Sequence, residues 1–115
     1  MPDEPLIRSA ARRLIAARRV VVFTGAGVSR ESGIATFRDA DDGLWTRYDA
    51  MDMATYEGYV RDPEYVWRWY EHRFGLAARA APNAGHRALA DMEHLVPQLT
   101  VVTQNVDGLH VRALK

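Results

Sequence analysis

Apolar residues at the start of the chain recur with the period of a helix and are followed by a continuous apolar run. The recurring positions are Leu6, Ile7, Ala10, Leu14 and Ile15. This spacing predicts an amphipathic first helix, with its arginines mostly on other faces. Residues Val20 to Phe23 are then apolar without interruption, which is typical of a central strand covered on both faces.

The second half of the chain predicts two further helices and a second strand. Asp62 is an N-cap acceptor followed by proline, which is tolerated at the first helical position, and a helix extends from there to about Arg79. Another helix begins at Pro82 and is ended by Pro97. Residues Leu99 to Thr103 then form the second buried strand.

The order of these elements predicts an α/β fold. A Rossmann-like, doubly wound parallel sheet with flanking helices begins with this order of elements: helix, strand, glycine turn, helices and strand. Sheets average about five or six strands, whereas this chain shows only two, so we expect half a domain that lacks its C-terminal strands. Residues 39–48 are polar and aromatic without a period, which predicts a loop.

Composition excludes several classes of protein. The 115 residues include 15 basic and 15 acidic ones, so we expect neither nucleic acid nor a membrane as a partner. The absence of cysteine excludes disulfides and cysteine zinc sites in this chain, and Lys115, the only lysine, cannot serve a lysine-containing phosphate loop. The acidic N-terminus and the lack of an apolar run near about 20 residues predict a cytoplasmic protein.

The glycine turn after the first strand is a candidate phosphate site. Gly25 and Gly27 allow a tight turn and a close approach of a phosphate to backbone N–H groups. We expect Ser29 and Ser32 to cap a short helix that begins there. A simple tight turn is the alternative interpretation. The plain dinucleotide fingerprint does not match, because its third glycine would fall on Arg30.

Two longer motifs carry a resemblance to a known family. Residues 25–29 (GAGVS), 32–34 (SGI) and 37–38 (FR) resemble the opening motif of the sirtuins, the NAD-dependent protein-lysine deacylases. Residues 103–110 (TQNVDGLH) resemble that family's second motif and directly follow the second strand. The resemblance implies that residues 1–115 are the N-terminal half of a sirtuin NAD-binding domain.

The resemblance implies a set of residues that bind NAD. They are Gly25, Ala26, Gly27, Ser29, Phe37, Arg38, Gln104, Asn105 and Asp107. Ala26, Gly27 and Ser29 would hold the pyrophosphate. Arg38 would lie near phosphate and ribose, and Phe37 would shield the reacting ribose from water.

Asn105 and Asp107 are the catalytic residues that the resemblance places in this chain. Gln104 and Asn105 would orient the nicotinamide ribose, and Asp107 would accept a hydrogen bond from the carboxamide. In the family's reaction, the acyl oxygen of a modified lysine attacks that ribose and nicotinamide leaves, giving O-acyl-ADP-ribose. The alternative for Asp107 is a helix cap.

Tyr70 and Arg73 indicate which acyl groups are bound. Arg73 lies within the apolar stripe of the long helix, three residues after Tyr70 and on the same face. The pair resembles the Tyr-x-x-Arg pair by which class III sirtuins bind a succinyl or malonyl carboxylate, with deacetylation as the family's basic activity. The alternative is an arginine whose stem packs while its head reaches water or an acid.

Parts of the sirtuin machinery are expected outside this chain. The family's catalytic histidine and its four-cysteine zinc module follow the second motif, and His110 matches a different, structural histidine. Ala35-Thr36 replaces the family's usual Pro-Asp, and Leu114-Lys115 replaces its usual glycine. We therefore expect acylated-lysine protein substrates for the parent enzyme, an inactive isolated chain and a role for a complementary C-terminal chain. The alternatives are a non-catalytic NAD or ADP-ribose binding module and a defective fragment.

Overall fold

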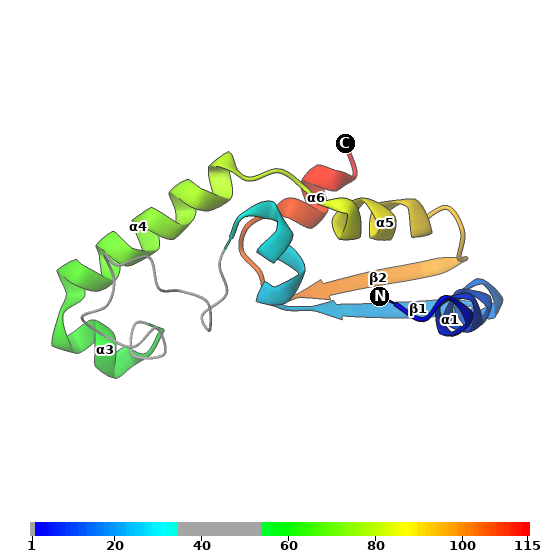
Figure 1. The fold of residues 1–115 in the computed structure, drawn as a ribbon. Helices are drawn as coiled ribbons and strands as arrows, with labels where there is room; N and C mark the ends of the chain where they lie inside the picture. Colours follow the sequence, from blue (N-terminus) through cyan, green and yellow to red (C-terminus); the bar gives the residue numbers. More distant parts are fainter. Residues whose placement is uncertain (1, 35–53) are drawn as a thin grey trace.

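The computed structural model describes residues 2–34 and 54–115, and these form a parallel pair of strands with helices beside it, while the helices of residues 56–61 and 63–79 extend away from it (Figure 1). In chain order the elements are α1 (Glu4–Ala16), β1 (Arg19–Thr24), the 3₁₀ helix η1 (Ala26–Ser32), α3 (Tyr56–Arg61), α4 (Pro63–Arg79), α5 (Ala84–Met92), β2 (Gln98–Thr103) and α6 (Leu109–Ala113). The predicted α/β class is confirmed. The predicted loop at residues 39–48 lies outside the described residues.

The sheet determines where the two sequence motifs meet. β1 and β2 run parallel, with Val20 opposite Leu99 and Thr24 opposite Thr103. The carboxyl ends of parallel strands share one edge, which is where α/β folds bind ligands. The helix η1 and the segment 104–108 both start from that edge (Figure 1).

The prediction that β1 is covered on both faces was wrong for the described part of the chain. Val20 is buried, but Val21 and Phe23 are 68% and 65% exposed. Successive strand residues point to opposite faces, so one face of β1 is covered and the other is open. The helices α5 and α6 lie along the same side of the sheet (Figure 1).

Helix α1 forms as predicted, but none of its residues is buried. Its local contacts include Asp3, whose Oδ1 accepts a 3.3 Å hydrogen bond from the Leu6 N–H, and an exposed Glu4–Arg8 pair at 2.7 Å. Exposed pairs of this kind contribute less than about 1 kcal/mol. The apolar stripe of α1 therefore adds little to the core of the described residues.

Helix α4 begins and ends where the sequence predicted. Asp62 caps it by accepting a hydrogen bond from the Tyr65 N–H at 3.2 Å. Val66 and Trp69 are buried in a small apolar cluster, with Tyr65 packed against it. The preceding helix α3 was not predicted, because its six residues are too few to show a helical period.

Asn83 joins the start of α5 to the glycine-turn helix. Its Oδ1 accepts hydrogen bonds from the N–H groups of Gly85 and His86, and His86 Nδ1 accepts one from the Asn83 N–H at 3.1 Å, completing a capping box. Asn83 Nδ2 donates to the Val28 carbonyl at 2.8 Å and to Ser32 Oγ at 3.0 Å. One side chain thus caps a helix and connects it to η1.

Helix α5 ends earlier than predicted. It stops at Met92, and residues 93–97 form turns and a bend before β2. The N–H groups of His94 and Leu95 donate to the carbonyls of Asp91 and Met92, three residues back, so tighter turns replace the α-helical pattern there. Val96 is buried although it lies outside the helix.

The double role of Asn83 leads to a stability prediction. Asn83→Ala should lower the free energy of unfolding by about 2 kcal/mol, because it removes a cap and leaves the Val28 carbonyl without its amide donor. Urea unfolding followed by circular dichroism measures this. Asp3→Ala, which removes only the cap of the exposed α1 and no tertiary contact, should lower it by a smaller amount, about 0.5 kcal/mol. Equal effects of the two variants would contradict the role of Asn83 as a tertiary link.

Candidate functional site

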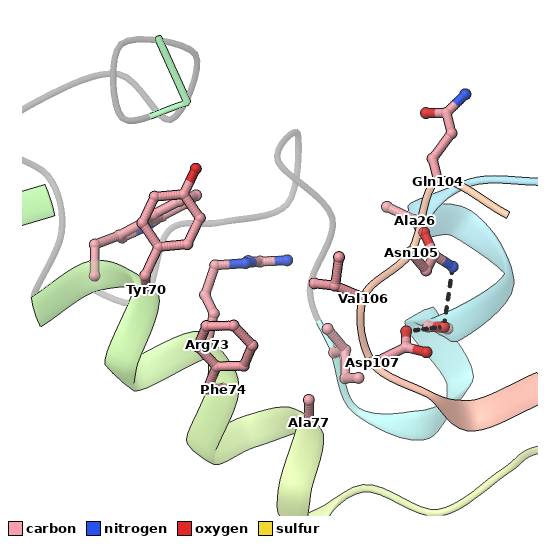
Figure 2. Close-up of a pocket in the computed structure, with 12 residues that line it drawn as sticks. Ala26, Tyr70, Arg73, Phe74, Ala77, Gln104, Asn105, Val106 and Asp107 are labelled. Atoms are coloured by element: carbon pink, nitrogen blue, oxygen red, sulfur yellow. Dashed lines mark hydrogen bonds between the residues drawn. The ribbon is translucent and has the colours of Figure 1, made fainter. Parts of the chain in front are cut away.

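A cavity of about 150 Å³ lies between η1, the segment after β2 and helix α4 (Figure 2). Its lining residues are Ala26, Ser29, Ile34, Trp69, Tyr70, Arg73, Phe74, Ala77, Gln104, Asn105, Val106 and Asp107. Both sequence motifs and the Tyr70–Arg73 pair therefore meet at one place. We call this space the central cavity.

The central cavity contains most of the predicted site residues that the structure describes. The members that line it are Ala26, Ser29, Tyr70, Arg73, Gln104, Asn105 and Asp107. Gly25 and Gly27 belong to the turn beside it and do not line it. Phe37 and Arg38 lie outside the described residues.

The glycine turn begins η1 without a side-chain cap. Gly25 is the N-cap residue, whereas Ser29 lies in the middle of η1 and Ser32 at its end, so the predicted capping role of the two serines was wrong. A Cβ added to Gly27 would meet no atom within 4 Å. The described chain thus leaves open space beside this backbone.

Ser29 is the centre of the polar contacts in the central cavity. Its side chain is buried, and its Oγ donates to Asp107 Oδ2 at 2.6 Å. Asn105 Nδ2 donates to Ser29 Oγ at 3.4 Å, and His86 Nε2 also lies 3.4 Å from Ser29 Oγ. A hydroxyl has one hydrogen and two lone pairs. All three are used by these contacts.

His86 contacts Ser29 from outside the central cavity, a role that was not predicted from the sequence. Because His86 Nδ1 accepts from the Asn83 N–H, we infer that Nε2 carries the hydrogen and donates to Ser29. Burial lowers the pKa of His86 below its usual 6.5; nearby His110 lowers it further, and Asp107 opposes both. The Asn83-x-x-His86 spacing of a capping box was the available signal.

Asn105 is hydrogen-bonded to residues at the ends of both strands. Its Nδ2 donates to the Gly25 carbonyl at 2.8 Å, and its backbone N–H donates to Thr103 Oγ1 at 3.0 Å. Together with the bond to Ser29, these contacts use both amide hydrogens of the side chain. Its Oδ1 accepts no hydrogen bond from residues 2–34 or 54–115, so it remains an acceptor for a ligand.

Asp107 makes the helix-cap contact that was the alternative to its predicted role in binding NAD. Its Oδ1 accepts a hydrogen bond from the Leu109 N–H, the first residue of α6, at 3.0 Å. Its Oδ2 accepts from Ser29. A carboxylate has about four lone-pair sites, so these two contacts orient the group and still leave it able to accept from a ligand.

The last residues of the two strands, Thr24 and Thr103, are linked through their side chains. Thr24 Oγ1 donates to Thr103 Oγ1 at 2.9 Å and lies 2.8 Å from His110 Nε2. The rings of His110 and His86 meet edge to face, with centroids 4.9 Å apart. His110 does not line the central cavity, in agreement with a structural role.

Trp69 supports the two residues predicted to bind the acyl group. The Tyr70 ring packs on it edge to face at 4.9 Å, and the Arg73 guanidinium lies 5.3 Å from its ring centroid. Cation–π contacts of this kind attract an arginine to a tryptophan face. Figure 2 shows Arg73 extending from α4 toward the segment with Val106 and Asp107. The central cavity therefore has a fixed cation on one wall and Asp107 on another.

Two further observations concern metals and membranes. No group of three or more histidine, aspartate or glutamate side chains that could hold a metal ion occurs in the described ranges. Among the same residues, no helix combines the length and apolarity needed to cross a membrane.

Comparison with known protein sequences supports the motif-based assignment. Residues 25–114 match the model of the Sir2 family. An NAD-dependent protein deacylase from Methylococcus capsulatus is 56% identical over 97 residues, which are 84% of this chain and 38% of that protein. NAD-dependent protein deacylase 2 of Corynebacterium efficiens is 47% identical over 113 residues, 96% of this chain and 44% of that protein. The chain spans about two-fifths of the length of these relatives.

Solved structures show the same similarity. A mutant Sir2 homologue in complex with 2′-O-acetyl ADP-ribose has a TM-score of 0.81 and 44% identity, covering 99% of this chain and 44% of its own. A Sir2 homologue–NAD complex gives a TM-score of 0.77 and 43% identity, with coverage of 98% and 42%. The structure of Sir2 bound to an acetylated peptide has a TM-score of 0.73 and 30% identity, and the match covers 93% of this chain and 41% of that one. The family match, these relatives and the geometry of the two motifs agree: the chain belongs to the Sir2, or sirtuin, family.

Proposed function

We propose that this chain provides the NAD-binding half of an NAD-dependent protein-lysine deacylase. The observation that carries the proposal is the central cavity, where Ser29 of the first motif is hydrogen-bonded to Asn105 and Asp107 of the second. A relative that aligns with 113 residues of this chain, and so with both segments, is named an NAD-dependent protein deacylase, and similar structures are complexes with NAD or with an acetylated peptide. Deacylation belongs to the longer proteins, of which this chain spans about two-fifths.

The central cavity fits the reacting end of NAD. A cavity of about 150 Å³ holds a molecule the size of benzene, so a nicotinamide ring fits it and a whole dinucleotide does not. Because no described atom lies within 4 Å of a Cβ added to Gly27, a phosphate of the cofactor can approach the backbone there. The donor set also suits the cofactor, because Asn105 Oδ1 and the Asp107 carboxylate are acceptors for ribose hydroxyl and carboxamide N–H groups.

NAD, when bound, supplies a ribose carbon that receives the acyl oxygen as nicotinamide leaves. The chain's own residues position it. Asp107 accepts a hydrogen bond from the carboxamide and so turns that group, while Asn105 and Gln104 orient the ribose. Ser29 donates its only hydroxyl hydrogen to Asp107, so we assign it to holding that carboxylate and not to the pyrophosphate. Such preorganised groups lower a barrier because they need no rearrangement during the reaction.

Negatively charged acyl groups are the favoured substrates in this proposal. Arg73 presents a guanidinium to the central cavity, and a planar fork of N–H donors matches a carboxylate. Tyr70 is adjacent on the same wall and can donate its hydroxyl. Trp69 holds both side chains, which reduces the entropy lost when they bind a succinyl or malonyl group.

One observation favours a second function for the chain by itself. Among the described residues that line the central cavity there is no histidine to act as a general base. Loss of such a base costs about 10²-fold or more in rate. An NAD or ADP-ribose binding module is therefore the second candidate, and a complementary C-terminal chain would convert it into a deacylase.

NAD binding is the first prediction of this proposal. Calorimetric titration should show saturable binding of NAD and ADP-ribose to the purified chain. Asn105→Ala should weaken the affinity about tenfold, since one hydrogen bond of about 1.4 kcal/mol is lost. The control Asp91→Asn, on an exposed position of α5, should leave it unchanged. A folded wild-type chain that binds neither ligand would contradict the proposal for this chain and leave the motifs as marks of family alone.

The buried His86 predicts a loss of stability in acid. Its folded-state pKa lies below its usual unfolded value of 6.5, so its stabilising contribution is present above pH 6.5 and is lost as pH falls toward the folded pKa. Urea unfolding at about pH 7.5 and about pH 5.5 should show a smaller pH effect for His86→Gln than for the wild type. The exposed His94→Gln is the control and should keep the wild-type slope. If the free energy of unfolding changed equally with pH in the wild type and in His86→Gln, His86 would not be the source of the pH dependence.

Acyl preference is tested by Arg73→Met. The assay uses a chimera of residues 1–113 with the segment that follows the matching part of the M. capsulatus relative. The substitution should lower desuccinylation about 10- to 100-fold, because a charge-assisted hydrogen bond contributes about 1.5 to 3 kcal/mol, with little effect on deacetylation. Arg68→Met, which removes an exposed arginine of α4 paired with Glu64, is the control. Unchanged turnover of a succinyl peptide would exclude Arg73 as the carboxylate-binding residue.

A further inference from the structure

Arg112, on α6, donates hydrogen bonds to three backbone carbonyls in two segments of the chain. Its Nη1 donates to the Ala80 carbonyl at 2.9 Å. Its Nη2 donates to the Ala77 carbonyl at 2.8 Å and to the Asp107 carbonyl at 3.1 Å. The side chain is half-buried. Neither the motifs nor the proposed chemistry assigns this residue a role.

The segments that Arg112 connects are the two opposite walls of the central cavity. Ala77 lies in the last turn of α4 and Ala80 is its C-cap, while Asp107 belongs to the segment that also contains Asn105. A helix C-terminus has unsatisfied carbonyls and partial negative charge, which a cation complements. The planar guanidinium fork offers several donors at fixed angles, and it therefore holds α4 at a defined angle to this segment.

We propose that Arg112 is a positioning residue that sets the distance between the acyl-binding wall and the NAD-binding wall of the central cavity. The proposal rests on the proposed function of Tyr70, Arg73 and Asp107. Arg112 touches none of the reacting atoms. It acts by fixing the end of the helix that carries Tyr70 and Arg73.

The geometry of α4 makes its C-terminal end a sensitive point. The helix extends away from the sheet (Figure 1), and its buried cluster is formed by its own Val66 and Trp69 together with Tyr65. At 1.5 Å per residue, Tyr70 lies about 10 Å along the helix from Ala77, so a tilt of about 10° there displaces Tyr70 by about 2 Å. A misplacement of about 1 Å near the chemistry can cost about 10²-fold in rate.

The test measures the position of α4 directly. The chain has no cysteine, so pairs of introduced cysteines take spin labels without background. Glu71→Cys with Arg87→Cys reports the distance between α4 and α5, and Arg19→Cys with Arg87→Cys reports β1 against α5; all three positions are exposed. Double electron–electron resonance then gives the distance distribution of each pair in the wild-type background, in Arg112→Met and in Arg79→Met. Arg79 is the matched control, an exposed arginine in the same last turn of α4.

The expected result is specific to α4. Arg112→Met should broaden and shift the α4–α5 distribution while the β1–α5 distribution stays unchanged, and Arg79→Met should alter neither. An unchanged α4–α5 distribution in Arg112→Met would overturn the proposal. Broadening of both pairs, or loss of helical circular dichroism, would also overturn it, because Arg112 would then support the fold in general.

A binding measurement separates this proposal from the proposed function. Arg112→Met should weaken binding of a succinyl-lysine peptide, in the presence of ADP-ribose, by about tenfold or more, because the peptide spans both walls. ADP-ribose affinity alone should change less than that. If the wild-type chain binds no succinyl peptide, the acyl assignment fails while the distance measurement still decides the role of Arg112. Equal losses for peptide and ADP-ribose would contradict a role in setting the position of α4.

Discussion

The hydrogen bond from Ser29 to Asp107 is the contact on which the site depends. It joins residues 78 positions apart at 2.6 Å and connects the glycine-turn helix to the segment after β2. The Ser29 side chain is buried, and leaving a buried polar group unpaired costs about 1–3 kcal/mol. Asn105 and His86 complete the contacts of the same hydroxyl. A displacement of any one partner therefore disturbs the others.

The parallel sheet makes this contact possible. Because β1 and β2 run in the same direction and end in register at Thr24 and Thr103, the two motifs start from neighbouring points. The side chains of Val20 and Thr24 are buried on the side of the sheet along which α5 and α6 lie, and this burial stabilises the pairing of β1 with β2 (Figure 1). The exposed side chains of Val21 and Phe23 show that the other face is open in the described chain. Hence the site depends on a sheet of which one face still exposes large apolar side chains.

Local signals predicted the elements that the backbone pattern and caps determine. The proline after Asp62 and the apolar spacing located α4 correctly, and the apolar runs located both strands to within one residue. The six-residue α3 and the five-residue α6 were missed, since each is too short for a period to appear. The early end of α5 was missed because Val96, which continues the apolar stripe, is buried from a bend and not from a helix.

By itself, the sequence determined the fold class, the family resemblance and the residue types available for binding NAD, because these follow from short-range patterns and motifs. Only the tertiary structure showed that Tyr70 and Arg73 share a cavity with Asn105 and Asp107. It alone also showed that Ser29 holds Asp107 and does not cap a helix, and that Arg112 ties α4 to the second motif. These contacts join residues far apart in the chain. No local period encodes such a contact, because it depends on how the helices and strands pack together.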